Sequence, residues 1–351
     1  MDNIKEEVVK EIHKLAITKQ LNFLIGSGTS VPAIPLMGNI VIDNPEKYDK
    51  TELLKLRNAK LVDIAKKVCN VLTSNTDSNS IKDSMNIVRV LSTYQQFVHS
   101  VLDVLTLSNS RQTPKNVNIF TTNYDLFIEK ATDKVLLNNR LIFNDGASGY
   151  FNRYLDSSNY NRVVSYKGLN DNYIDEIPSL SLIKPHGSLN WEEHKEKMLI
   201  KSSVAPTPAV VKPDGLEEEN TFLNNHFHEM LRIFQLELDK QQSVLFIIGF
   251  SFQDKHIAKM VRRAVQNSEL MVLVFGYTDN DRNTFLLNLG NKLFEEEHPN
   301  FKIITPKNLP KKFITTENDS SGKKIKTFKL CNLNAILATS NWEESNHDSK
   351  P

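Results

Sequence analysis

Short, almost wholly apolar runs alternate with amphipathic stretches along most of the chain. Between Ile4 and Ala16, apolar residues recur at every third or fourth position, which predicts an opening helix. Six apolar runs bounded by polar or turn-forming residues are typical of buried strands. They cover residues 21–25, 117–120, 179–183, 243–248, 271–275 and 301–304. Because helical stretches alternate with several of these runs, we expect a doubly wound α/β fold with a parallel sheet covered on both faces.

The region from about residue 50 to residue 109 has a different pattern. Its long stretches of helical periodicity, such as LVDIAKKVCNVL, predict a helical insertion. Packing of these apolar residues on the sheet is the simplest explanation, and an oligomer interface is the alternative. The strongly polar residues 341–351 predict a disordered tail. We therefore expect one domain over residues 1–340.

Composition places the chain among soluble globular proteins, since 40% of its 351 residues are hydrophobic and 24% are charged. A formal net charge of +1 provides no overall basic field, so neither nucleic acid nor a membrane surface is an expected partner. Cys69 and Cys331 form no CxxC pair, which argues against a disulfide framework or a cysteine-based zinc site. The charged start and the lack of a membrane-length apolar run favour a cytoplasmic location.

Polar segments follow five of the predicted strands, and four of these segments contain glycine. In the first, GSGTS, Gly26 and Gly28 permit a sharp turn and a close approach to a ligand, and backbone N–H groups in such turns attract anions. In an α/β sheet, ligands bind at the carboxyl ends of strands, so we expect the segments to converge on one crevice. The alternative is that they are ordinary turns and helix caps. The other four are TTNYD (121–125), KPHGSLNW (184–191), GFSFQDKHI (249–257) and GYTDND (276–281).

The order of these motifs resembles that of the sirtuin, or Sir2, superfamily of NAD-consuming enzymes over roughly residues 20–280. The resemblance implies a Rossmann-like Sir2 core with NAD as substrate. GSGTS matches the pyrophosphate loop, and TTNYD matches the loop that holds the nicotinamide ribose. KPHG matches the loop of the general-base histidine, and GFS matches the second nucleotide-binding loop.

Two departures narrow this resemblance. Protein-deacylating sirtuins continue the glycine loop with Gly-Ile-Pro-Asp-Phe-Arg, but here Ala33-Ile34-Pro35 leads into Leu36-Met37-Gly38. They also carry a four-cysteine zinc ribbon, whereas residues 187–248 contain no cysteine, so we expect no zinc ribbon. Without these two features, the set of motifs resembles the Sir2-like domains of bacterial anti-phage defence proteins, which hydrolyse NAD. The segment NDGASGYFNRY (144–154) resembles the Sir2 partners of HerA-type ATPases, which implies such a partner. We also expect homo-oligomerisation through the helical insertion.

The resemblance also implies catalytic roles. His186 would act as general base, because an imidazole near neutrality can take a proton from water or from a ribose hydroxyl. Asn123 would hold a ribose hydroxyl and orient the attacking water. Asp125 would either stabilise positive charge on the ribose or cap the following helix. The expected reaction releases nicotinamide and ADP-ribose, and the alternatives are a protein deacylase and a non-catalytic sensor of NAD-derived nucleotides.

Further residues are assigned to nucleotide binding. The pyrophosphate would be bound by Gly26, Ser27, Gly28, Thr29 and Ser30, the ribose loop would include Thr122, and the adenosine side would be formed by Gly249, Phe250 and Ser251. Tyr277 and Thr278 would touch adenine or its ribose, although a polar turn also explains them.

No metal is expected. His226 and His228 lie two positions apart on a predicted helix and would face apart. Asp254 is predicted to cap a helix rather than contact the ligand.

Overall fold

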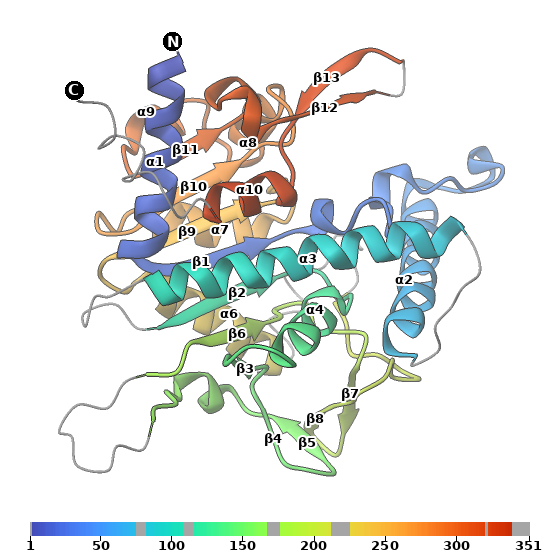
Figure 1. Ribbon diagram of the computed structural model, residues 1–351. Coiled ribbons are helices and arrows are strands. Elements are labelled where there is room, and N and C mark those ends of the chain that lie inside the picture. Colours follow the sequence, from blue (N-terminus) through green and yellow to red (C-terminus); the bar gives the residue numbers. More distant parts are fainter. Residues whose placement is uncertain are drawn as a thin grey trace.

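A seven-stranded, wholly parallel sheet forms the centre of the computed structural model, which describes residues 2–74, 82–107, 115–166, 176–211, 225–319 and 322–338 (Figure 1). The strand order is β11-β10-β9-β1-β2-β6-β3. The strands are β1 (Gln20–Ile25), β2 (Asn116–Thr121), β3 (Ile142–Asn144), β6 (Ser179–Ile183), β9 (Ser243–Ile248), β10 (Met271–Phe275) and β11 (Phe301–Ile304). The predicted doubly wound α/β fold is confirmed, and all six predicted strands are present.

Both faces of the sheet are buried. Along β9, Phe246 and Ile248 join one hydrophobic cluster while Leu245 and Ile247 join the other, because successive side chains of a strand point to opposite faces. The first face packs against α1 (Asp2–Thr18), α2 (Lys50–Thr73), α3 (Lys82–Leu107), α4 (Phe127–Leu136) and α10 (Leu330–Leu337). The second packs against α6 (Asn225–Leu238), α7 (Lys255–Ala264), α8 (Asp281–Asn288) and α9 (Phe294–Glu297). Burial on both faces explains why the strands are almost continuously apolar.

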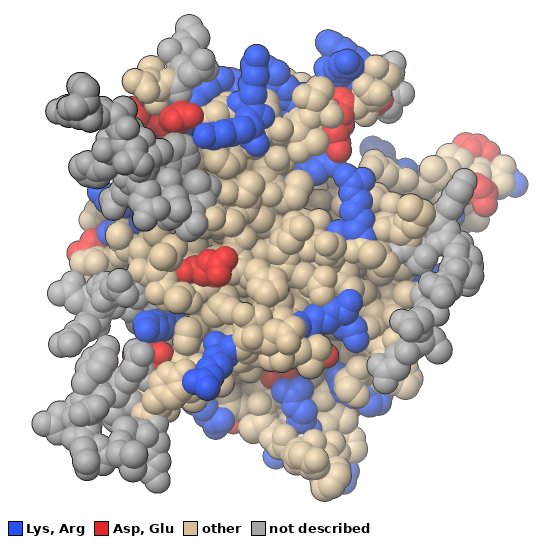
Figure 2. All heavy atoms as spheres, viewed as in Figure 1, with Lys and Arg blue, Asp and Glu red and all other residues tan. Residues whose placement is uncertain are grey.

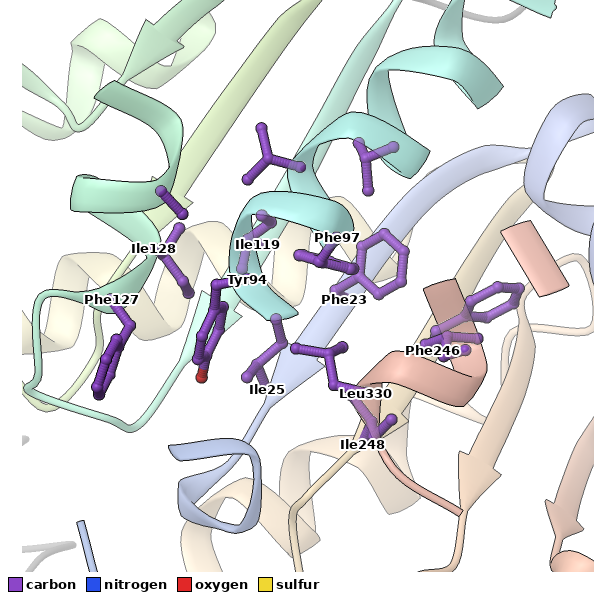
Figure 3. Close-up of a cluster of buried hydrophobic side chains, with 14 of the residues drawn as sticks. Phe23, Ile25, Tyr94, Phe97, Ile119, Phe127, Ile128, Phe246, Ile248 and Leu330 are labelled. Atoms are coloured by element: carbon purple, nitrogen blue, oxygen red, sulfur yellow. The ribbon is translucent and has the colours of Figure 1, made fainter. Parts of the chain in front are cut away.

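Helix α3 belongs to the core. The ring of Phe97 meets Phe23 of β1 edge-on at 4.9 Å between centroids, and Tyr94 stacks on Phe127 of α4 at 5.6 Å (Figure 3). The prediction that the apolar residues of this region pack on the sheet is confirmed for α3. Parts of the predicted insertion, residues 75–81 and 108–109, lie outside the described residues, as does the predicted tail at 341–351.

Two small antiparallel sheets were not predicted. One has the order β4-β5-β8-β7, and the other is the β12-β13 hairpin. Their strands are β4 (Ala147–Ser148), β5 (Arg153–Leu155), β7 (Trp191–His194), β8 (Lys197–Ile200), β12 (Thr315–Asn318) and β13 (Lys324–Thr327). The described residues also form short 3-10 turns: η1 (Ser27–Ser30), η2 (Met37–Asn39), η3 (Pro45–Lys47), η4 (Ser157–Asn161), η5 (Pro306–Asn308) and η6 (Lys311–Phe313).

The surface carries both signs of charge. On the face shown in Figure 2, Lys and Arg side chains lie in several separate places, with Asp and Glu between them and a broad area of uncharged residues near the middle. Among the described helices, none is long and apolar enough to cross a membrane.

Candidate functional site

The loops after β1 and β9 pack against each other at the carboxyl edge of the sheet. Gly28 N donates to Gly249 O at 3.0 Å. A Cβ on Gly26 would lie 2.4 Å from the same Gly249 oxygen, and Gly249 has a left-handed φ of +67°. The sequence interpretation assigned these glycines to ligand approach, but the structure shows that contact between the two loops also requires them. The chain reverses its direction of winding between β1 and β9, which is where open α/β sheets bind ligands.

Two of the three hydroxyls of the glycine loop, those of Thr29 and Ser30, point into the protein. Thr29 Oγ1 donates to Gly26 O and lies 2.7 Å from the Tyr94 hydroxyl of α3. Ser30 Oγ donates to Asp125 Oδ2 at 2.7 Å. These bonds anchor the loop to α3 and to the loop after β2. Ser27 and Gly28 are the exposed part of the segment.

The loop after β2 brings Asn123 against the glycine loop. Its Nδ2 donates to Gly26 O at 3.1 Å, and its backbone N–H donates to Thr121 Oγ1. The opposite side of the amide, Oδ1, is buried and has no hydrogen-bond partner among the residues that the structure describes. A buried amide oxygen without a partner is costly, so this acceptor is suited to a hydroxyl or a water that enters the site.

Asp125 is held from both sides. Its Oδ2 accepts from Ser30, and its Oδ1 accepts from Phe127 N at 3.3 Å, at the first residue of α4. Burial raises the pKa of Asp125, and the nearby Lys184 ammonium opposes that rise. The carboxylate therefore links the glycine loop to the start of α4.

Lys184 directly follows β6, and the residue is buried at 1% exposure. Its three donors reach Asp125 O at 2.6 Å, Glu129 Oε1 at 2.5 Å and Ser188 Oγ at 3.0 Å. Burial raises the pKa of Glu129, again opposed by Lys184. Lys184 is the first residue of the KPHG motif, but the sequence alone predicts no role for it. Lysine is rarely buried, and only the tertiary structure reveals its partners.

His186 forms a second buried cluster with the loop after β9. Its Nε2 lies 3.0 Å from Nε2 of His256 and 3.3 Å from Oδ2 of Asp254. The other Asp254 oxygen lies 2.6 Å from Nδ1 of His256. Burial lowers the pKa of His186 to about 4, with Asp254 opposing and His256 adding to the shift. His186 is therefore a neutral imidazole at neutral pH.

The predicted cap role of Asp254 is wrong for its side chain. Asp254 does occupy the N-cap position of α7, but its carboxylate makes no capping hydrogen bond. The two imidazoles draw the carboxylate away from the helix backbone, since both of its oxygens face ring nitrogens.

The contact between His186 and Asp254 closes the site over the sheet edge. β6 and β9 are separated by β2 and β1 in the strand order, a span of about 14 Å at ordinary strand spacing. Their loops must therefore cross the ends of β1 and β2 in order to meet. Together with the contacts above, this makes a continuous ring through residues 26–30, 121–125, 184–189 and 249–256.

Other candidate residues lie around this ring. Thr122 is half-buried beside Asn123, and Ser251 is exposed. The ring of Phe250 packs edge-on against Phe252 in the second hydrophobic cluster. Tyr277 donates its hydroxyl to Glu317 of β12, and Thr278 N–H donates to Asp281. These last contacts tie the loop after β10 to the β12-β13 hairpin and to α8, rather than to the glycine loop.

Within the described ranges, one group of three side chains could hold a metal ion, namely His186, Asp254 and His256. Sequence reasoning did not identify this group. A histidine two residues after an aspartate, just beyond a glycine-containing loop, was the available signal. His226 and His228 lie on α6 two positions apart, an arrangement that points them in different directions.

Comparison with known proteins agrees with this architecture. The model of the SIR2-like domain family matches residues 117–294, about half of the chain, from β2 to the start of α9. The match includes Asn123, His186 and Asp254, and no curated protein matches the chain. Sir2-like domains use NAD, so a NAD-related activity is the general expectation. On this evidence, the chain belongs to the SIR2-like domain family.

Proposed function

We propose that the protein hydrolyses NAD to nicotinamide and ADP-ribose at the ring of loops described above. The observation that carries the proposal is the buried, unpaired amide oxygen of Asn123, which shares this ring with the neutral imidazole of His186. Cleavage of a glycosidic bond of this kind needs an oriented water, a base and a fixed ribose.

In the proposed reaction, water attacks the ribose carbon that bears nicotinamide. The carbon–nitrogen bond breaks, its electron pair neutralises the pyridinium ring, and nicotinamide leaves. His186 takes the proton lost by the water, and solvent later removes it. Asn123 Oδ1 accepts a hydrogen bond from the ribose or from the water, while its Nδ2 remains tied to Gly26 and fixes the amide.

Asp125 serves this reaction as a positioning residue. Its carboxylate is committed to Ser30 and to the start of α4, and its charge lies near that of Lys184. The pyrophosphate would lie against the exposed Ser27 and Gly28, and the adenosine side against Gly249–Ser251, since these loops meet at the reversal of the sheet. The charged groups nearest the reaction thus hold the loops, and the neutral imidazole moves the proton.

NAD consumption by wild type, Asn123→Ala and His186→Ala tests the proposal, with His194→Gln in the exposed part of β7 as the control. Turnover should fall by about 10²- to 10⁴-fold in both site variants, while NAD binding by calorimetry stays within a few-fold. The control should match wild type. Chromatography should identify nicotinamide and ADP-ribose as products.

Three outcomes would count against the proposal or its assignment of residues. If wild type, with any partner it requires, binds NAD and leaves it intact for hours, the protein is a sensor. Release of O-acetyl-ADP-ribose from acetylated peptide would make it a deacylase. Hydrolysis that survives both substitutions would remove Asn123 and His186 from the mechanism.

We also propose that NAD depletion serves anti-phage defence, with a homo-oligomer of this chain coupled to a HerA-type ATPase. The supporting feature is an aromatic pair in the segment that carries the narrower resemblance. Tyr150 and Phe151 are 87% and 91% exposed, and their rings meet edge-on at 4.8 Å. Exposed aromatic residues of this kind are common anchors of protein interfaces.

Light scattering of the chain alone and with a genomically neighbouring ATPase tests this assembly. Tyr150→Ser/Phe151→Ser should weaken the complex at least tenfold and leave basal NAD turnover unchanged. A monomer that ignores the ATPase would contradict the proposal.

A further inference from the structure

We propose that Asp254 and His256 are positioning residues that keep the proton of neutral His186 on Nε2, so that Nδ1 is the nitrogen that accepts a proton. The assignment of protons concerns the folded protein itself. Its catalytic consequence rests on the proposed NAD hydrolysis.

The first step concerns His256. Its Nδ1 lies 2.6 Å from Oδ1 of Asp254, outside the geometry of a regular hydrogen bond, and two facing lone pairs at this distance would repel each other. Nδ1 of His256 must therefore carry a proton. When the ring is neutral, its Nε2 carries a lone pair.

The second step concerns the hydrogen bond between His256 and His186. The two Nε2 atoms are 3.0 Å apart, a hydrogen-bond distance at which exactly one proton belongs between them. Because Nε2 of His256 is an acceptor, Nε2 of His186 is the donor. Asp254 Oδ2, 3.3 Å away, presents a second acceptor to the same nitrogen. Neutral His186 thus has its remaining lone pair on Nδ1.

The scaffold holds this arrangement in place. Asp254 and His256 flank the start of α7, where Ala258 N donates to Asp254 O at 3.0 Å and closes the first turn. His256 is buried at 3% exposure. On the other side, the His186 carbonyl accepts from Val211 N at 2.9 Å. The backbone is therefore fixed on both sides of the contact, and the two rings lie against each other between these fixed segments.

The consequence for the reaction is electrostatic. When Nδ1 of His186 takes a proton from the attacking water, the ring becomes positively charged. Its Nε2–H already faces a lone pair of His256 and a carboxylate oxygen of Asp254, so the new charge is stabilised without rearrangement. The proton leaves again from Nδ1 after ADP-ribose has formed.

The same three side chains could instead bind a divalent metal ion. This alternative predicts different protonation of the two Nε2 atoms. A metal bound between the two Nε2 atoms would require both to be deprotonated. A measurement of which ring nitrogens carry protons therefore distinguishes the hydrogen-bonded histidine pair from a metal site.

Long-range ¹H–¹⁵N correlation spectra of histidine-labelled protein measure the tautomers directly, without turnover. His186→Gln and His256→Gln assign the two rings. We expect Nε2–H for His186 and Nδ1–H for His256. The opposite tautomer of His186, or stoichiometric zinc in the purified protein with both Nε2 atoms metal-bound, would overturn the proposal.

Asp254→Asn provides the sharper kinetic test. In either orientation, the amide places a donor against one of the two ring nitrogens that are proposed to donate, so it disfavours the proposed tautomers. We expect kcat to fall by about 10- to 100-fold, less than the full loss of a general base, with KM and NAD affinity within twofold. Asp254→Glu should recover part of the rate.

Lys255→Ala, an exposed neighbour on α7, serves as the matched control and should leave kcat unchanged. An unchanged kcat in both Asp254→Asn and His256→Gln would remove the pair from the mechanism. If wild type shows no NAD hydrolysis at all, the proposed function fails, but the spectra still decide the tautomers.

Discussion

Lys184 and His186 are two residues apart in one loop, yet they belong to different kinds of buried cluster. The three donors of Lys184 are all used by protein acceptors, and the ammonium sits among Asp125, Glu129 and Ser188. The His186 cluster contains one carboxylate and two imidazoles, and in the tautomer proposed above neutral His186 keeps a lone pair on Nδ1.

The difference separates a structural cluster from a reactive one. A saturated ammonium has no donor left for a ligand, so the Lys184 cluster can only hold loops together. An imidazole with a lowered pKa stays neutral and can accept a proton. Burial acts on both clusters, but it creates an ion pair in one and a base in the other.

Breaking the Lys184 cluster should have the largest effect on stability. Lys184→Met leaves the buried Asp125 and the half-buried Glu129 without their cation, which should lower the free energy of unfolding by about 3–5 kcal/mol in urea titrations at pH 7. Lys67→Met is the control, because it removes an exposed ion pair with Asp63. It should lower the free energy of unfolding by about 0.5 kcal/mol or less.

The pH dependence of this variant has a definite sign. The pKa values of Asp125 and Glu129 are already raised, and loss of the cation raises them further. Folding then favours their protonated forms. The loss of unfolding free energy in Lys184→Met relative to wild type should therefore shrink as pH is lowered towards 4.5. A deficit that does not change with pH would show that lost packing, not charge, is the cause.

The His186 cluster should produce the opposite response to acid in the wild type. The pKa of His186 is about 4 in the folded protein against 6.5 for the free side chain. The unfolded chain therefore binds a proton that the folded protein does not, and this contribution, about 3 kcal/mol in all, is lost as pH falls from 6.5 to 4.

Denaturation of wild type and His186→Asn across this range measures the contribution as a difference between the two slopes. His194→Gln is the control. Parallel curves for wild type and His186→Asn would show that His186 titrates normally.

The smallest expected effect concerns the loop contact that supports the His186 cluster. Gly26→Ala places a Cβ 2.4 Å from Gly249 O, and such overpacking costs about 1–3 kcal/mol. We expect a lower melting temperature and weaker NAD binding, because the loop that leads to Asp254 must shift. Gly38→Ala meets nothing within 4 Å and should be close to neutral. Equal behaviour of the two variants would mean that the loops adapt freely.

The sequence predicted the main sheet well because each strand is buried on both faces. SVLFII and MVLVF have no polar residue after the first position, and their observed bounds match the predicted ones. The four-stranded sheet could not be predicted from the sequence, because its strands β4 and β5 contain only two and three residues. Such strands are too short to show an alternation of apolar and polar positions.

The site was only partly predictable. Motif order pointed to Asn123 and His186, and the structure places both in one ring of loops, although their catalytic roles remain predictions. Lys184, Tyr94 and His256 could not be assigned, because their functions depend on partners distant in sequence. Tyr94, for example, has the spacing of an apolar helix residue, and its hydroxyl meets Thr29 only in the folded chain.

The strand order also determines when the site can form during synthesis. β1 pairs with β2 on one side and with β9 on the other, so one edge of this apolar strand stays open until residue 243 onwards has emerged. At ribosomal rates, the interval between β2 and β9 lasts roughly 6 to 24 s. Asp254 and His256 are made only after it. An unfinished chain therefore exposes a strand edge to aggregation well before it has the residues with which we propose that it attacks NAD.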